Sequence, residues 1–441
     1  MGLKYIEQVK SVILLLLILF SLTLTFSIWT YSPTVDTNEA APIVDIAIAE
    51  KKKIEDVIKP YRLLVSQDNN LYGSIATQDI DGVLSLIKNW EVQAVELVTR
   101  HASMTQLNEY VNAPNRITLF FQAEVPIKTY SSVLNFVEQD FTNPSFNRLI
   151  IDWSEISSNE MKMYFINTTS KKVYSASIKK FNEGNSIKNI VKEATSFSLY
   201  NEIVREDKLS LYVSTSPEET VRYTYLIKEI PPVKFKNALF RNPSLVRSNT
   251  LGTSEQQFTD DATLMNVNSS YHRISFVNPA AESEKGKELG ELIQRSVNFV
   301  NEHDGWTDDY RYSSNPSSQQ IRYQLHFFGL PVFSHDTETE IIQYWGDNDV
   351  YRYTRPYFTL NAIPFNQRDV SLLSGQDIYD LLATFPDIEL SSINDIMPGY
   401  KLSRDDDQST LTLEPFWYYS MGGSWIRVST ELRGGDEFGL E

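Results

Sequence analysis

The sequence contains no cysteine among its 441 residues and only five histidines. Without thiols the chain cannot form disulfides, a cysteine nucleophile or a cysteine-ligated zinc site. The motifs of phosphate-binding loops, nucleophile elbows, zinc proteases and dinucleotide-binding folds are also missing. No catalytic constellation can be assembled from what remains. We therefore expect a protein that is not an enzyme, with no catalytic residues, no cofactor and no bound metal.

Positive charge is scarce as well, because 40 Lys and Arg stand against 57 Asp and Glu and give a net charge of −17. The first 35 residues sum to +1, so the remainder carries −18. Nucleic-acid binding requires a Lys/Arg surface that neutralises phosphates, and an acidic body argues against it. A composition of 41% hydrophobic and 22% charged residues is typical of a folded globular chain. We expect a folded body with no nucleic-acid partner.

One long segment lacks charge altogether. Residues 11–35 contain no Asp, Glu, Lys or Arg, and 13 residues between Val12 and Trp29 are Leu, Ile, Val or Phe. A helix of this length spans about 37 Å, which is enough to cross a hydrocarbon core of about 30 Å. The sequence therefore predicts a transmembrane helix over residues 11–33, in contact with the lipid bilayer.

This segment is predicted to remain attached to the protein. Its apolar core is longer than that of a signal peptide, and no good small-x-small cleavage site follows it. Trp29 and Tyr31 instead match the aromatic anchors found at membrane interfaces. Lys4 and Lys10 precede the segment and acidic residues follow it, so the positive-inside rule places the N-terminus in the cytoplasm. We expect a single-pass protein of the cell membrane, with residues 1–10 inside and the bulk of the chain extracytoplasmic.

Four hydroxyl residues occupy the second half of this segment: Ser21, Thr23, Thr25 and Ser27. At about 100° per residue, the pair Ser21/Thr25 and the pair Thr23/Ser27 lie on opposite faces of a helix. Small hydroxyl residues four apart let a partner helix approach closely and can hydrogen-bond across the contact. The alternative is that each hydroxyl bonds back to its own helix and does nothing else. The pattern alone leaves both interpretations open.

The rest of the chain predicts an α+β body with antiparallel sheets and packed helices. Alternation of apolar and polar residues predicts strands at 116–123, 320–328 and 409–419, and helical spacing predicts helices at 78–88, 126–136 and 284–303. The body is divided into an N-terminal α+β domain, 36–200, a central domain, 201–305, and a C-terminal antiparallel-sheet domain, 306–441.

A local group of acidic residues and histidine invites interpretation as a metal site. His303-Asp304 and Asp308-Asp309 are close in the sequence and carry the right ligand types. They lie where a helix runs into a polar loop, however, so a solvated linker is the favoured interpretation.

Aromatic residues are concentrated near the C-terminus, at 414–419 and Trp425. Trp417, Tyr419 and Trp425 could line a groove for a cell-wall fragment or a peptide. At strand spacing such rings are more often part of a core. The core interpretation is favoured, and the groove is kept as the alternative.

Two short motifs and the overall layout resemble a known family. The motifs are Phe328-Gly329-Leu330-Pro331-Val332-Phe333 and Glu414-Pro415-Phe416-Trp417, and the uncharged segment ends on Ile28-Trp29-Thr30-Tyr31 before Pro33. With a short basic N-terminus and an acidic body behind one uncleaved helix, the chain resembles the YycH (WalH) family over its full length. None of these motifs is catalytic.

The resemblance implies a regulatory protein of the WalK–WalR two-component system. It implies modulation of a WalK-type sensor histidine kinase through transmembrane helix contacts, together with a YycI-like single-pass partner, and so control of cell-wall homeostasis. Two partner helices match two hydroxyl faces, so with the resemblance we favour the four hydroxyl residues as the partner-binding surface and Trp29 and Tyr31 as interface anchors. The alternative function is an extracytoplasmic receptor that uses an aromatic groove in the C-terminal domain. The sign of the regulation stays open.

Overall fold

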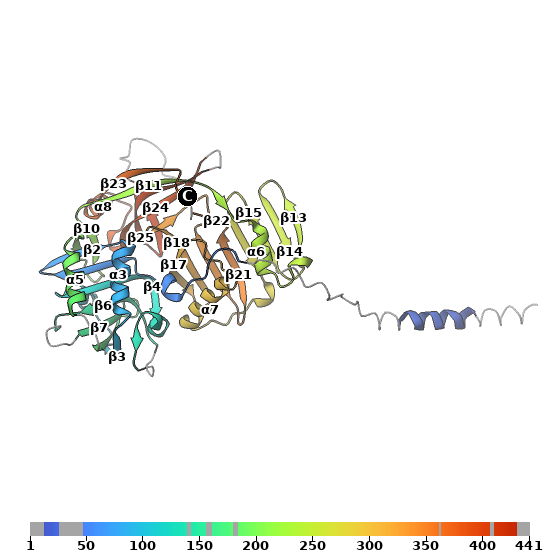
Figure 1. Cartoon of the computed structure of the whole chain (residues 1–441), viewed down its shortest axis with the longest axis horizontal. Coiled ribbons are helices and arrows are strands. Elements are labelled where there is room, and N and C mark those ends of the chain that lie inside the picture. Colours follow the sequence, from blue (N-terminus) through green and yellow to red (C-terminus); the bar gives the residue numbers. More distant parts are fainter. Residues whose placement is uncertain are drawn as a thin grey trace, which may run out of the picture. The chain divides into compact units, whose positions relative to one another are not determined.

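The structure, a computed structural model of the whole chain, describes residues 13–25, 47–138, 143–155, 161–179, 184–360, 363–405 and 410–429. It separates into a short unit, Met1–Asp45, and a large unit, Ile46–Glu441 (Figure 1). In the short unit, residues 13–25 are helical and their side chains are exposed. The other positions of the predicted 11–33 span lie outside the described residues. Among the helices that are described, none has both the length and the apolar character needed to cross a bilayer.

The first sheet of the large unit, the N-terminal sheet, has ten strands. They are β1 (Arg62–Gln67), β2 (Asn70–Ser74), β3 (Glu91–Thr99), β4 (Arg116–Pro126), β5 (Asn135–Phe136), β6 (Ser145–Asp152), β7 (Met161–Asn167), β8 (Lys172–Lys179), β9 (Ser198–Ile203) and β10 (Leu211–Ser214). Their order is β10-β9-β2-β1-β4-β6-β7-β8-β3-β5, and only β3 and β5 pair in parallel.

Helices pack on both faces of this sheet, because its central strands are apolar on both sides. Alternate residues of a strand point to opposite faces. Leu63 and Val65 of β1 pack in one core cluster with α3 (Thr77–Ile87) and α5 (Gly184–Ala194). Leu64 packs in another cluster, with Leu107 and Val111 of α4 (Met104–Asn112).

The second sheet, the C-terminal sheet, has fourteen strands. They are β11 (Pro217–Leu226), β13 (Arg247–Leu251), β14 (Glu255–Thr259), β15 (Leu264–Asn268), β16 (Arg273–Val277), β17 (Asp309–Ser317), β18 (Gln320–Phe327), β19 (Leu330–Phe333), β20 (Glu340–Trp345), β21 (Val350–Pro356), β23 (Asn366–Ser374), β24 (Ile393–Arg404), β25 (Thr410–Met421) and β26 (Ser424–Arg427). The path runs β13-β14-β15-β16-β21-β20-β18-β19-β24-β25-β11-β23, with β17 on β18 and β26 on β25. A separate pair joins β12 (Lys228–Glu229) and β22 (Phe358–Thr359).

The short strand β19 bridges the two halves of the C-terminal sheet. It pairs antiparallel with β18 and in parallel with β24, through Val332↔Tyr400 and Phe333↔Lys401. The preceding turn has Phe328 and Gly329 at φ of 47° and 87°. A Cβ on Gly329 would lie 2.6 Å from Thr77 Oγ1, so this position requires glycine for both its backbone angle and its close contact. The first motif of the family resemblance is therefore this bridging hairpin.

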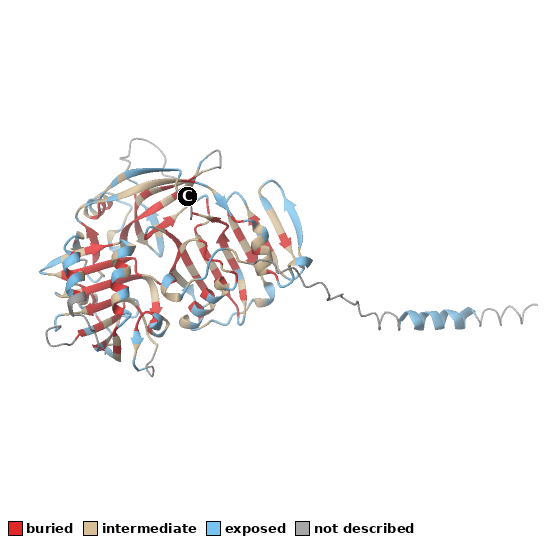
Figure 2. Cartoon of the chain, viewed as in Figure 1, coloured by how far each residue is buried: buried red, intermediate tan, exposed pale blue. Residues whose placement is uncertain are grey.

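The remaining helices are α2 (Ile54–Val57), α6 (Pro232–Leu239), α7 (Leu289–Asn301) and α8 (Gly375–Leu382), with 3₁₀ turns η1 (Ile127–Ser132), η3 (Pro243–Leu245), η4 (Pro279–Ala281) and η5 (Leu390–Ser392). Helix α7 buries Leu292, Ile293, Val297 and Val300, the apolar stripe of its sequence. Figure 2 shows that buried residues follow the strands of both sheets, whereas the edge strand β13 is exposed along its length.

A buried ion pair joins the two sheets. Arg62 of β1 contacts Asp395 of β24 at 2.9 Å, and their side chains are 3% and 13% exposed. Arg62 Nη2 also donates to the Ile396 carbonyl at 2.8 Å, and the Tyr61 hydroxyl donates to Asp395 at 2.5 Å. Because a buried charge without its partner is strongly destabilising, this contact fixes where β24 meets the N-terminal sheet.

The predicted α+β class with antiparallel sheets is confirmed, and β4, β18, β25, α3 and α7 lie where the sequence places strands and helices. The predicted helix over 126–136 is wrong. The segment forms η1 and then β5, because Ile127 and Tyr130, three residues apart, are both buried, which suits three residues per turn. Domain boundaries at 36–200, 201–305 and 306–441 stay a prediction.

Candidate functional site

Two of the hydroxyl residues of the predicted membrane helix, Thr23 and Thr25, bond within their own helix. Thr23 Oγ1 donates to the carbonyls of Leu19 and Phe20 at 3.0 and 2.9 Å, and Thr25 Oγ1 donates to Ser21 at 2.8 Å. A helical Thr makes these bonds by default whenever no other acceptor is near. The contacts therefore do not distinguish a partner-binding face from an idle one.

The other members of that predicted site, Ser27, Trp29 and Tyr31, lie outside the described residues. Partner binding by Ser21, Thr23, Thr25 and Ser27 stays a prediction, as does interfacial anchoring by the two aromatic residues.

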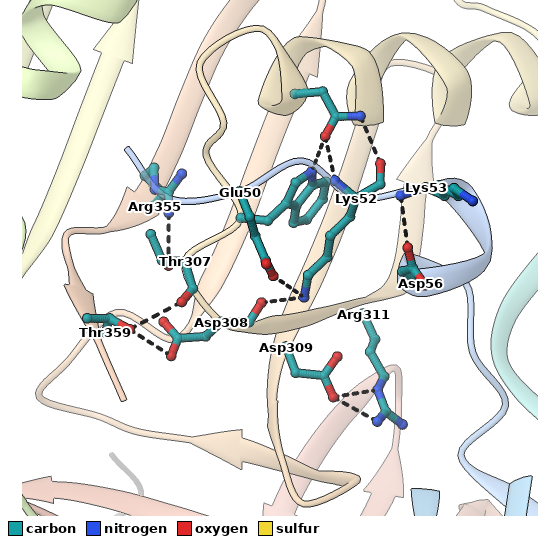
Figure 3. A network of polar contacts seen from close by, with 12 residues as sticks. Glu50, Lys52, Lys53, Asp56, Thr307, Asp308, Asp309, Arg311, Arg355 and Thr359 are labelled. Carbon is teal, nitrogen blue, oxygen red and sulfur yellow. Dashed lines mark hydrogen bonds and ion pairs between the residues drawn. The ribbon is translucent and has the colours of Figure 1, made fainter. Parts of the chain in front are cut away.

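The first described stretch of the large unit is bound to the C-terminal sheet before the chain forms β1. Ile48 N donates to the His303 carbonyl at 3.1 Å, and Ala49 N donates to the Asp304 carbonyl at 2.7 Å. Trp306 N in turn donates to the Glu50 carbonyl at 3.2 Å. We call residues 47–53, together with the loop 301–308 that receives them, the N-terminal clip (Figure 3).

Asn301, the last residue of α7, is the centre of the clip. Its Oδ1 accepts from Lys52 N and from Trp306 Nε1, both at 2.9 Å, while its Nδ2 donates to the Lys52 carbonyl at 2.8 Å. Lys52 Nζ donates to the Asp308 carbonyl at 2.7 Å. One amide side chain thus satisfies both backbone groups of Lys52, which fixes the register of the segment.

A buried arginine donates hydrogen bonds to the loop 301–308. Arg355 of β21 is fully buried; its Nη1 donates to the Gly305 carbonyl at 2.6 Å, and its Nη2 donates to Thr307 Oγ1 at 3.2 Å. Its guanidinium carbon lies 5.0 Å from the Phe235 ring centroid, in cation–π contact. The loop 301–308 is therefore positioned by a strand 50 residues further along the chain.

Two titratable groups of the clip have shifted pKa values. Burial raises the pKa of Asp308 to about 6, although its Oδ1 accepts from Leu360 N at 2.8 Å. Burial, with the neighbouring Arg355, lowers the pKa of His303 to about 3, so this imidazole is neutral at physiological pH.

The interpretation of His303-Asp304 and Asp308-Asp309 as a solvated linker is therefore wrong, since His303 is 3% exposed. The four residues do not converge either: Asp309 pairs with Arg311 at 2.7 Å and Asp304 with Lys51 at 3.5 Å. Over the described ranges, no group of three His, Asp or Glu side chains is arranged to hold a metal. No local pattern of residues indicates the clip, because Lys52 and Asn301 are 249 residues apart.

The aromatic trio of the alternative function is divided between two faces of the C-terminal sheet. Trp417 and Tyr419 are 5% and 7% exposed and pack with Ile378 and Leu382 of α8, which agrees with the core interpretation. Trp425 is half-buried and lines a groove of about 750 Å³.

Tyr418, rather than its two neighbours, faces this groove, because alternate strand residues point to opposite sides. Its ring packs on Phe333 of β19 with centroids 4.5 Å apart. A Cβ on Gly399 would lie 3.1 to 3.2 Å from both rings, so glycine leaves room for this pair. The sequence analysis does not identify Tyr418 or Phe333 as groove residues. Tyr418 could have been found, because it follows Trp417 in a strand and must point to the opposite face from that core residue.

The protein is of the α+β class, with two joined antiparallel-rich sheets and a loop, 301–308, that binds residues 47–53. The chain belongs to the YycH family. Residues 7–196 match the YycH protein N-terminal domain, and residues 208–435 match the YycH protein C-terminal domain.

Individual relatives agree with this assignment. The chain is 21% identical over 445 residues to the two-component system WalR/WalK regulatory protein YycH of Bacillus subtilis (strain 168), with 97% of each chain covered. Its fold is similar to the crystal structure of YycH from Bacillus subtilis, with a TM-score of 0.75 and 19% identity over 88% of this chain and all of that one.

Proposed function

We propose that this protein is a membrane-anchored regulator of a sensor histidine kinase of the WalK type. Membership of the YycH family and the name of the Bacillus subtilis relative support this. Residues 11–33 form the transmembrane helix, residues 1–10 lie in the cytoplasm and the bulk of the chain is extracytoplasmic. The protein acts with a YycI-like single-pass partner and controls cell-wall homeostasis.

The observation that carries this proposal is the N-terminal clip. The chain that leaves the uncharged segment enters the large unit at one fixed place, where Asn301 holds both backbone groups of Lys52. The clip therefore fixes the point at which the chain joins the body.

The proposed contact between membrane helices uses Ser21, Thr23, Thr25 and Ser27. A bound helix shifts a kinase between two states only when it has different affinities for them. Coupling free energies of this kind are typically about 1–3 kcal/mol, or about fivefold and upward in an equilibrium constant. Close packing and interhelical hydrogen bonds at small hydroxyl residues can supply that difference.

The test replaces the four hydroxyl residues with Leu and leaves the large unit unchanged. We expect kinase-dependent transcription to change by about fivefold or more, and co-purification of the kinase and the YycI-like partner to weaken. The matched control changes Leu17, Leu19, Leu22 and Leu24 to Ile, which alters as many positions and keeps the hydrophobicity. Unchanged transcription and unchanged co-purification in the Leu variant would rule out the helix contact.

A second candidate function is an extracytoplasmic receptor that binds a wall fragment or peptide. The groove beside Trp425 favours it, although Trp417 and Tyr419 are buried elsewhere. The two functions are separable: exchange of residues 11–33 for an unrelated membrane span should abolish kinase coupling and leave ligand binding by the groove intact.

A further inference from the structure

The groove lies where β19 bridges the halves of the C-terminal sheet. One wall comes from β16, β18 and β20 and the opposite wall from β24, β25 and β26. Its volume of about 750 Å³ is within the range of roughly 300–1,000 Å³ that is usual for small-molecule sites. The groove thus has the size of a site for a ligand of one or a few rings.

Positive charge is concentrated in this groove. The lining contains four cations, Arg273, Arg322, Lys401 and Arg427, and two carboxylates, Glu338 and Glu340. On a chain of net charge −17 this balance is unusual. A cleft lined by one sign of charge raises the local concentration of ligands of the opposite sign.

The excess charge is on the wall formed by β24 and β26. Arg322, on the other wall, is 3.5 Å from Glu340 and partly neutralised by it. The ion pairs between described residues include neither Lys401 nor Arg427. Glu414, which faces Lys401 across the β24–β25 pair, contacts Arg222 instead at 4.0 Å. Lys401 and Arg427 therefore form a positively charged wall that can receive an anion.

The opposite wall offers acceptors for hydroxyl groups. Burial raises the pKa of Glu338 and of Glu340. Thr337 also lines the groove.

Aromatic rings complete the lining. Trp425 is half-buried, with Phe333 at 6.3 Å between centroids, and Tyr271 is exposed. A ring with an apolar face and polar edges, which is the character of a sugar, packs on such side chains while its hydroxyls reach polar neighbours.

We propose that the groove binds an acidic saccharide, a sugar ring that carries a carboxylate or a phosphate. The anion lies at Lys401 and Arg427, and the ring lies against Trp425. This inference rests on the second candidate function and gives it a ligand class. It does not depend on the helix contact.

The test uses the full chain in detergent and isothermal titration calorimetry. N-acetylmuramic acid probes a carboxylate-bearing sugar and glucose 6-phosphate a phosphate-bearing one, so the two arms separate the sources of the anion. N-acetylglucosamine supplies a ring without charge, inorganic phosphate an anion without a ring, and a poly-glutamate peptide an anionic chain. We expect at least one acidic sugar to bind, and the other three probes to bind about tenfold more weakly or not at all.

Variants assign the binding to the groove. Lys401→Gln and Arg427→Gln should each weaken the acidic sugar by about tenfold, because each removes a charge-assisted hydrogen bond. Trp425→Ala should weaken the acidic sugar and leave any response to inorganic phosphate unchanged. Arg247→Gln is the control, since Arg247 is an exposed cation paired with Asp261 on β13–β14.

Four results would overturn the proposal: no binding of either acidic sugar at millimolar concentration, equal binding of the neutral sugar, binding of the peptide alone, or acidic-sugar binding that survives both Gln substitutions. None of these results affects kinase coupling through residues 11–33, so failure here and failure of the helix contact can be told apart.

Discussion

The two sheets differ in what they bury. Among the described residues of the N-terminal sheet and its helices, Arg62 is the one charged side chain in the interior. The C-terminal part buries Arg311, Arg355 and three histidines, His272, His303 and His326. The first sheet is held together mainly by apolar packing, whereas the second also buries cationic and imidazole groups, of which Arg355 positions the loop 301–308. This contrast can be tested at three points.

The largest expected effect is at the junction of the sheets. Arg62→Met leaves Asp395 buried without its partner, and we expect a loss of about 3–5 kcal/mol in the free energy of unfolding. Urea denaturation of the full chain in detergent measures it. The matched control is Lys59→Met, because the Lys59–Asp81 pair at 3.0 Å is partly exposed and should cost less than about 1 kcal/mol.

The double variant Arg62→Met with Asp395→Leu removes both charges, and much of the lost stability should return. If Arg62→Met loses no more stability than the Lys59→Met control, the Arg62–Asp395 pair does not stabilise the junction of the sheets, and the contrast between the two sheets does not include this contact.

The second effect is a pH dependence that belongs to the C-terminal sheet. Burial and the nearby Arg311 lower the pKa of His326 to about 3, with Asp309 acting in the opposite direction. The unfolded chain takes up a proton at this histidine near pH 6.5, whereas the folded chain does not. The contribution of neutral His326 to the free energy of unfolding is therefore complete above pH 6.5 and is lost as the pH falls below it. Between pH 6.5 and 5 the loss is about 2 kcal/mol.

His326→Asn keeps a donor for the Gln324 carbonyl, which His326 Nδ1 contacts at 3.0 Å, and removes the titration. The stability of this variant relative to the parent should therefore rise by about 2 kcal/mol from pH 6.5 to pH 5. His101→Asn, at an exposed position beside the N-terminal sheet, is the matched control. A difference at His326 that does not change with pH would remove the electrostatic contrast between the sheets.

The smallest effect concerns the N-terminal clip. Asn301→Ala removes three hydrogen bonds, and local opening of residues 47–53 should become easier by about 1–2 kcal/mol, with little change in global stability. Hydrogen exchange of the Ile48, Ala49 and Lys52 amides measures this. Asn298→Ala on the exposed face of α7 is the control. Unaltered exchange in the Asn301 variant would mean that the backbone hydrogen bonds to His303 and Asp304, and not the Asn301 side chain, hold the segment.

Strand and helix types could be predicted because they depend on local periodicity. The alternation in 320–328 and the helical stripe of 284–303 gave β18 and α7, although α7 begins at Leu289. The 126–136 segment was misjudged because a 3₁₀ turn and a helix bury similar spacings over six residues. Trp417 and Tyr419 belong to the core, as the sequence analysis favours. The sequence does not show that Tyr418 lines a groove, because this depends on which face of β25 is covered by other elements.

Local patterns of residues are sufficient to predict the uncharged N-terminal segment, the acidic balance, the absence of thiol chemistry and the α+β class, since each depends on composition or on neighbours a few positions apart. The clip, the sheet junction and the groove become visible only once the chain is folded. Lys52 meets Asn301 across 249 residues and Arg62 meets Asp395 across 333. Contacts of that range are set by how strands are ordered in a sheet, which no local pattern of side chains encodes.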